Sequence, residues 1–334
     1  MNTKRIISLV ASLALVLSLS VGLTGCGDKA AQDDNQGSTD GEGTKYTVGI
    51  CQLVQHEALD AATQGFIDAL NEALPGQVEF QNKNASGDNA NCSTIVNGFV
   101  SDGVDLIMAN ATGALTAAAA ATSDIPILGT SITAYGVALD IDDFNGTVGG
   151  NISGTSDLAD LEAQANMITE WFPEAKKVGL LFCSAEPNSR YQIDEVRKAL
   201  EAQGVTCEEF AFTDSNDVSS VAQKAADFSD VVYIPTDNTA ASNTEAIANV
   251  LIPAGVPAIC GEEGLCRGCG VATLSISYYD LGVTTGKMAA KILKGEANIS
   301  EMPVEYTDAT PKYNASICDQ LGITPLDGYE AIDG

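Results

Sequence analysis

The stretch from Thr47 to Leu70 reads TVGICQLVQHEALDAATQGFIDAL and has the pattern of a β-strand that passes directly into an α-helix. A short apolar run over Val48–Ile50 precedes apolar residues that recur at helical spacing from Ala58 to Leu70. Such a pair opens a βαβ unit, and ligands of open parallel sheets bind beside the loops at the carboxyl ends of the strands. The loop Gln52–Glu57, which includes Gln55, is therefore predicted to face a ligand.

The same alternation of strand and helix patterns continues through both halves of the chain. Strands are predicted at 78–82, 104–109, 125–129, 177–183, 207–212, 230–235, 258–261, 271–277 and 304–306, and helices at 91–101, 114–122, 157–172, 189–203, 218–226, 240–251 and 279–293. This rhythm predicts an α/β fold with two doubly wound parallel-sheet lobes joined by a multi-strand hinge. The first lobe is expected to comprise 46–153 plus 276–302, and the second 154–275 plus 303–334.

The amino-terminal segment has the pattern of an export signal with a lipidation site. Lys4 and Arg5 precede an apolar run over 6–21, and Leu23-Thr24-Gly25-Cys26 then supplies small residues before a cysteine. We therefore predict a signal peptide over 1–25, a lipid-modified Cys26, and a disordered tether over 26–45, which is rich in Gly, Asp and Ser. The mature protein is expected on the outer face of a bacterial cell membrane, held there by its lipid.

The charge balance excludes several classes of partner. The chain has 16 Lys and Arg residues against 45 Asp and Glu residues, a formal net charge of −29. Nucleic acids and anionic membrane surfaces bind basic faces, so neither is an expected partner. The acidity is typical of a soluble surface.

The nine cysteines give little support to a metal or redox centre. Cys51, Cys183 and Cys260 lie in apolar runs, where cysteine acts as a small hydrophobe, and we expect most of the cysteines to be free thiols. Cys266 and Cys269 form one Cys-x-x-Cys pair, but the single histidine, His56, lies in another segment, so a tetrahedral zinc site is not completed. The pair is interpreted as a local disulfide or as two unpaired thiols in a loop; a redox role is the weaker alternative. No metal or cofactor is expected.

The loops that follow the predicted strands carry polar groups suited to a zwitterion. Thr112, Gly113 and Thr133 offer hydroxyls and backbone N–H groups that could hold a carboxylate, and Asp237 offers an anion for an ammonium group. Each of these could instead cap the helix that follows it. The remaining candidate ligand contacts are Gln52, Gln55, Asn188, Asn238 and Glu263, with Tyr135 or Tyr191 stacking on the ligand side chain.

Several short motifs, taken in order, resemble one known family. They are Gln52–Asp60 with Gly65-Phe66, Asn84–Asp88, Ala111-Thr112, Asn151–Asp157, Glu186–Ser189, Asp237-Asn238 and Tyr278–Gly282. From about Tyr46 to Pro325 the chain resembles the lipid-anchored substrate-binding proteins of ABC transporters, in the family that includes tryptophan- and other aromatic amino-acid-binding proteins. The resemblance implies a type I periplasmic-binding-protein fold with three crossings between the lobes.

The sequence departs from the pattern of this family at three places near the expected cleft. His-Pro becomes His56-Glu57, Thr-Asp-Pro becomes Thr133-Ala134-Tyr135, and the acid before the paired tyrosines becomes Ser277. These changes alter both charge and shape where specificity is set.

The function implied by the resemblance is capture of a solute, not catalysis. A monomeric receptor would close its hinge on a small amino acid with an aromatic side chain (Trp, Tyr or Phe) and deliver it to the permease and ATPase subunits of an ABC importer. The alternatives are a sugar- or nucleoside-binding protein of the same fold, or a sensory co-receptor.

Overall fold

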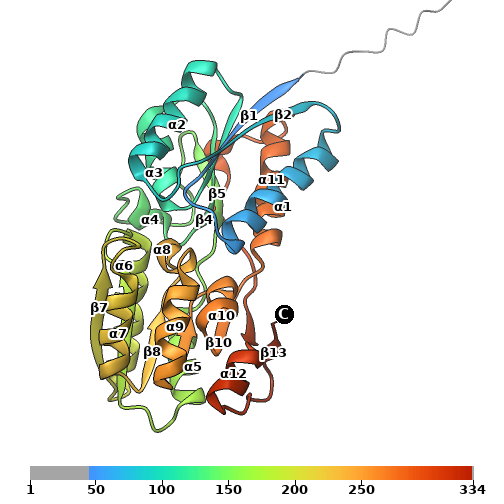
Figure 1. Cartoon of the computed structure of the whole chain (residues 1–334). Helices are drawn as coiled ribbons and strands as arrows, with labels where there is room; N and C mark the ends of the chain where they lie inside the picture. The colour runs from blue at the N-terminus through green and yellow to red at the C-terminus, as the bar shows by residue number, and fades with distance from the viewer. Residues whose placement is uncertain (1–44, 333–334) are drawn as a thin grey trace, which may run out of the picture. The chain divides into compact units, whose positions relative to one another are not determined.

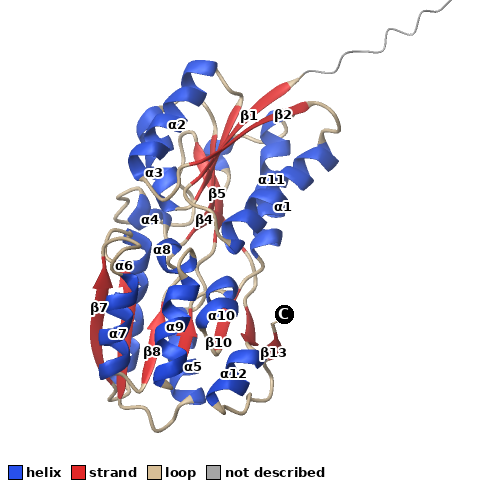
Figure 2. Cartoon of the chain, in the orientation of Figure 1, coloured by secondary structure: helices blue, strands red, loops and turns tan. Residues whose placement is uncertain are grey.

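The computed structural model describes residues 45–332, and within them the strands form two sheets. The first sheet has the order β11 (Glu305–Tyr306), β5 (Ile152–Ser156), β4 (Ile127–Ile132), β3 (Leu106–Asn110), β1 (Tyr46–Gln52), β2 (Val78–Asn84), and every pairing in it is parallel. The second has the order β13 (Glu330–Ala331), β12 (Thr310–Tyr313), β10 (Ala272–Ser275), β9 (Ala258–Cys260), β8 (Val231–Ile234), β6 (Lys177–Cys183), β7 (Thr206–Phe212). Its one antiparallel pairing joins β10 to β12. Figure 2 shows the strands of both sheets with helices packed around them.

Each sheet has its own set of helices. Those of the first sheet are α1 (Glu57–Ala73), α2 (Asn89–Asp102), α3 (Thr112–Ala121), α4 (Tyr135–Ala138) and α11 (Tyr278–Leu293), with a 3₁₀ turn, η1 (Ile299–Glu301). Those of the second sheet are α5 (Leu161–Trp171), α6 (Pro187–Ala202), α7 (Val218–Phe228), α8 (Asn238–Ala241), α9 (Thr244–Ala254), α10 (Glu263–Cys269) and α12 (Ala315–Leu321). Figure 1 shows α11, from late in the chain, lying beside α1.

Both faces of each sheet are buried, as the apolar strand sequences require. In β1, Val48 and Ile50 join a core with Phe66 of α1, whereas Cys51 joins a separate core with Phe99 of α2. The second sheet also has a core on each face. The predicted α/β fold class with two parallel-dominated sheets is confirmed.

The packing of α1 on α11 depends on glycines. A Cβ on Gly282 of α11 would lie 2.0 Å from the carbonyl oxygen of Ala62, and one on Gly65 of α1 would lie 2.2 Å from that of Tyr279. Only glycine permits the two helix backbones to approach this closely. Because α1 and α11 both begin at the site described below, this contact fixes the directions from which their first residues reach it.

Three segments of residues 45–332 pass between the sheets, and they correct the predicted lobe boundaries. The segments follow β5, β10 and β11. The predicted boundary after residue 153 divides β5, which lies wholly in the first sheet, and the boundary after residue 302 assigns β11 to the wrong sheet. β11 pairs with β5, at Glu305 with Thr155, although it is only two residues long.

Two predicted elements of the second half differ in the structure. The single helix predicted at 240–251 is two helices, α8 and α9, because the chain turns at Asn243, whose φ of −131° is not helical. Cys266 and Cys269 lie in α10 and not in a loop, since the Glu262 carboxylate caps that short, glycine-containing helix. Both are free thiols, as are the other cysteines of residues 45–332.

No helix of residues 45–332 is long and apolar enough to span a membrane. The predicted signal peptide and Cys26 lie outside this range.

Candidate ligand-binding site

A narrow cavity lies where loops at the carboxyl ends of strands from both sheets meet. Its lining residues from the first sheet and its helices are His56, Leu59, Ser131, Thr133, Asp157 and Tyr278; those from the second are Asn188, Thr236, Asp237, Asn238, Ala241 and Glu262. In this state the cavity holds no more space than about one water molecule requires. The lining combines three carboxyl groups with hydroxyls and amides, and it contains no Lys or Arg side chain.

Ser131 has a strained backbone and a hydroxyl without a partner. It lies at a register shift between β4 and β5, and its φ is +57°. Its Oγ is buried and has no hydrogen-bond partner among the described residues. Strain at a bulge and an unpaired buried hydroxyl both destabilise the fold, and such features concentrate at functional sites. The Ser131 hydroxyl therefore lies at the cavity with its hydrogen-bonding capacity unused.

Asp157 is the lining carboxylate with an unused oxygen. It follows β5 and is 5% exposed; its Oδ2 accepts a 2.8 Å hydrogen bond from the Tyr278 hydroxyl, whereas its buried Oδ1 has no partner. Burial raises the pKa of Asp157, and the hydrogen bond from Tyr278 opposes this effect. A buried carboxylate oxygen needs a donor. An ammonium group in the cavity would supply one, together with the opposite charge.

Asp237, the anion predicted to hold an ammonium group, has both oxygens occupied by the protein. Its Oδ2 accepts a 2.6 Å bond from the Cys183 backbone N–H, and its Oδ1 accepts a 2.8 Å bond from that of Ala240. Burial and the nearby charge of Glu186 raise its pKa to about 8. The structure thus places Asp237 at the cavity wall as a cap of α8 and a link to β6.

The amides predicted in the second half do lie at the cavity, where Glu186 organises them. The Glu186 carboxylate accepts bonds from the side-chain amides of Asn238, at 2.7 Å, and Asn188, at 3.3 Å. Asn238 Oδ1 also lies 3.3 Å from Nε2 of His56, a contact between residues 182 positions apart. Burial lowers the pKa of His56, which favours the neutral imidazole. This contact joins the loop after β1 to the start of α8.

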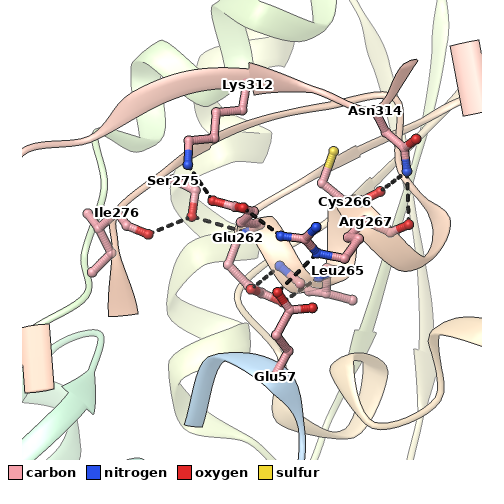
Figure 3. Close-up of polar contacts among 11 residues, drawn as sticks. Glu57, Glu262, Leu265, Cys266, Arg267, Ser275, Ile276, Lys312 and Asn314 are labelled. Atoms are coloured by element: carbon pink, nitrogen blue, oxygen red, sulfur yellow. Dashed lines mark hydrogen bonds and ion pairs between the residues drawn. The ribbon is translucent and has the colours of Figure 1, made fainter. Parts of the chain in front are cut away.

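A network of ion pairs lies next to the cavity, around α10 (Figure 3). Arg267 contacts Glu57 at 3.0 Å and Glu263 at 2.8 Å, and Lys312 contacts Glu263 at 2.5 Å. The buried Glu262 carboxylate accepts bonds from the Gly264 and Leu265 N–H groups. Burial raises its pKa to about 7. Glu262 lines the cavity, whereas Glu263, the predicted ligand contact, does not and belongs to the ion-pair network.

Four other predicted contacts do not line the cavity. Gln52 is buried, and its amide bonds to Asp60 and Thr63 hold its loop on α1. Gln55 is exposed in a groove beside Arg267. Thr112 is buried in the first turn of α3, and Gly113 packs against Asn89, whose Oδ1 would lie 2.1 Å from a Cβ there.

Neither tyrosine predicted to stack on a ligand reaches the cavity. Tyr135 is in the core, where its ring stacks on Phe144 with centroids 6.2 Å apart and its hydroxyl donates to the Thr155 carbonyl at 3.2 Å. Tyr191 lies in a separate surface groove beside α5 and α6. Tyr278 is instead the tyrosine that lines the cavity.

Three of the lining residues that sequence reasoning missed lie inside motifs that it had singled out: Leu59, Asp157 and Tyr278. Asp157 ends the motif Asn151–Asp157, but the helix was predicted to begin there, so Asp157 was interpreted as its first residue. In the structure, α5 begins at Leu161, and Asp160 is the cap. The spacing between the end of β5 and this cap is the signal that could have marked Asp157 as a strand-end residue.

These observations define a class of protein: two doubly wound lobes with an acid-lined cavity between them, at the strand ends. The residues 47–328 match the family of ABC transporter substrate-binding proteins, and the chain belongs to this family. Proteins of the family bind small molecules for ABC transporters and are extracytoplasmic. The described residues contain no group of three or more His, Cys, Asp or Glu side chains placed to hold a metal ion.

Similar proteins include a tyrosine-binding protein of Clostridioides difficile, which is 33% identical over 321 residues, covering 92% of this chain and 89% of the relative. A Streptococcus structure, an ABC domain in complex with L-Trp, has a TM-score of 0.82 at 30% identity, covering 86% of this chain and 100% of that one. A ligand-free, open structure of a substrate-binding protein from Clostridium difficile has a TM-score of 0.66 at 32% identity, covering 86% and 99%. The fold is the type I periplasmic-binding-protein fold.

Proposed function

We propose that this protein captures an amino acid with an aromatic side chain and delivers it to an ABC importer. The observation that carries the proposal is the unpaired Oδ1 of Asp157, which is buried in a cavity that also presents the unpaired hydroxyl of Ser131. The tyrosine-binding relative and the L-Trp complex support an aromatic side chain.

The cavity offers a distinct partner for each part of such a ligand. Asp157 would accept hydrogen bonds from the ammonium group, with a charge-assisted strength that neutral groups do not reach. The unpaired hydroxyl of Ser131, at the end of β4, would donate to the carboxylate, while the Thr133 side chain next to it would support the Asp157 carboxylate. Leu59, Ala241 and the Tyr278 ring would contact the aromatic ring.

Binding requires the two sheets to move apart and close again, because the cavity in this state is too small for any amino acid. The higher similarity to the L-Trp complex than to the ligand-free, open structure, at nearly equal identity, supports assigning this state as closed. The ligand then stabilises closure by binding groups from both sheets at once.

Anchorage by lipid at Cys26 is part of the proposal, and it rests on the sequence from Lys4 to Cys26. Metabolic labelling with a radioactive fatty acid tests it. Label should enter the wild-type chain and be absent from Cys26→Ser. A labelled Cys26→Ser chain would overturn the lipid assignment.

Titration calorimetry with L-tyrosine, L-tryptophan and L-phenylalanine tests the ligand class, with sugars and nucleosides as competing classes. Asp157→Asn should weaken binding of the preferred amino acid by at least about thirtyfold, because the ammonium group loses a buried charged partner. Asp160→Asn is the matched control, since Asp160 caps α5 and does not line the cavity. Binding of sugars alone, or equal affinity of Asp157→Asn and wild type, would overturn the proposal.

A further inference from the structure

Tyr278 holds the Asp157 carboxylate from a different crossing segment. Asp157 follows β5, whereas Tyr278 is the first residue of α11, after the segment that leaves β10. Ser277 caps α11, and this fixes where the Tyr278 side chain begins. The Tyr278 side chain is 6% exposed, and its hydroxyl donates to Oδ2 of Asp157 at 2.8 Å over a separation of 121 residues.

The hydrogen bond determines which oxygen of Asp157 is available. The Asp157 backbone is held separately, because its N–H donates to the Ile132 carbonyl at 3.2 Å. With Oδ2 occupied by Tyr278, only Oδ1 remains for a ligand. Without the phenol, the carboxyl group could rotate about its terminal torsion, which is a soft one.

The surroundings of Asp157 otherwise disfavour its charge. The titratable groups that interact with it are Tyr278, Tyr135 and Glu262, and His56 and Asp237 line the same cavity. None of these supplies a positive charge while His56 is neutral. The Tyr278 hydroxyl, followed by the Thr133 side chain, is the main side-chain donor that stabilises the ionised carboxylate.

We propose that Tyr278 is the positioning residue of the ligand site: its hydroxyl orients the Asp157 carboxylate and keeps it ionised for an ammonium group. The inference rests on the proposed function, because it assigns to Asp157 the role of ammonium partner. It assigns no contact between the Tyr278 hydroxyl and the ligand itself.

The test measures Asp157 both with and without ligand. In the ligand-free full-length protein, carboxyl ¹³C NMR titration follows the ionisation of Asp157, with the signal assigned by its absence from Asp157→Asn. In Tyr278→Phe the titration midpoint should move to higher pH, because the donor to the charged form is lost. Affinity for the preferred aromatic amino acid should fall about tenfold at neutral pH, and the loss of binding on acidification should begin at a higher pH.

Tyr279→Phe is the matched control, because the Tyr279 hydroxyl donates to Asp68 at the surface, at 3.0 Å, and its side chain is 43% exposed. It should leave the Asp157 midpoint and the affinity unchanged. If Tyr278→Phe does not fold, 3-fluorotyrosine at position 278, a stronger donor of the same shape, should move the midpoint to lower pH. An unmoved midpoint overturns the positioning role. A moved midpoint in a protein that binds none of the three amino acids supports the positioning role and overturns the proposed function alone.

Discussion

Nε of Arg267 lies 3.0 Å from Oε1 of Glu57, and this ion pair joins two residues 210 positions apart. Glu57 is the first residue of α1, on the first sheet, and Arg267 lies in α10, on the second. Glu263 and Lys312 continue the network on the second sheet. The pair thus joins a helix of the first sheet to a helix of the second, and the proposed separation of the two sheets would break it.

Replacing Glu57 by Gln should favour the open state. The side chains of Glu57 and Arg267 are 52% and 33% exposed, so the pair stabilises closure by at most about 1 kcal/mol, which corresponds to about a two- to fivefold loss of ligand affinity. The loss should shrink at high salt, which screens the wild-type pair. Calorimetry at low and high ionic strength measures both effects.

Lys198→Gln is the control for this variant, because Lys198 pairs with Glu195 within α6 and spans no opening. Its affinity should equal that of the wild type. Equal losses in the two variants, or a Glu57→Gln loss that grows with salt, would contradict an ion pair that favours closure.

Asp237→Ala should lower the free energy of unfolding of the ligand-free protein, which a residue that only contacts the ligand would not do. The substitution leaves the backbone N–H groups of Cys183 and Ala240 without acceptors, and each unmet buried donor costs about 1 to 3 kcal/mol. Urea unfolding of the ligand-free protein should show a lower midpoint. Wild-type stability combined with abolished binding would restore Asp237 as the ammonium partner.

The contrast between Asp237 and Asp157 shows what the sequence can and cannot predict about this site. Both carboxyls follow buried strands, but periodicity predicted only the strand before Asp237; β5 was not predicted, and Asp157 was assigned to a helix. Which oxygen stays unpaired depends on neighbours distant in sequence: Cys183 for Asp237, and Tyr278 for Asp157. No local pattern encodes those contacts.

The fold was more predictable because it follows from periodicity. β6 was predicted with its observed bounds, Lys177–Cys183, since its apolar run is bounded by a charged residue and a turn. Short elements such as β5 and α10 were not predicted, because they are formed by tertiary contacts and not by their own propensities. Of the predicted ligand contacts, four line the cavity: Thr133, Asn188, Asp237 and Asn238. Tyr135 and Tyr191 do not, because their positions depend on side-chain directions that the sequence pattern does not give.

Ser131→Ala should stabilise the protein while it weakens ligand binding. The wild-type hydroxyl is buried without a partner, so its removal relieves a cost of about 1 kcal/mol or more in the ligand-free state. The same hydroxyl is proposed to donate to the ligand carboxylate, and its loss should lower affinity about tenfold. Thermal unfolding and calorimetry on the same samples measure the two effects. Ser93→Ala, at an exposed position of α2, is the control for both measurements. A Ser131→Ala protein that is less stable than the wild type would show that the hydroxyl has a protein partner.

Glu262→Gln should change how stability depends on pH. Burial raises the pKa of Glu262 in the folded protein to about 7, from 4.5 when exposed, so the folded state binds more protons than the unfolded state between these values. Its contribution to stability is therefore greatest below about pH 4.5 and declines as the pH rises towards about 7. Glutamine does not titrate, and so the free energy of unfolding of the wild type relative to the variant should fall by about 3 kcal/mol across this window. Urea unfolding of both proteins at several pH values measures the difference, in which the other titrating groups cancel. If the free energies of unfolding of the two proteins differ by the same amount at every pH, folding does not change the pKa of Glu262. If the stability of the wild type relative to the variant rises with pH, the charged form of Glu262 is stabilised by a partner in the cavity.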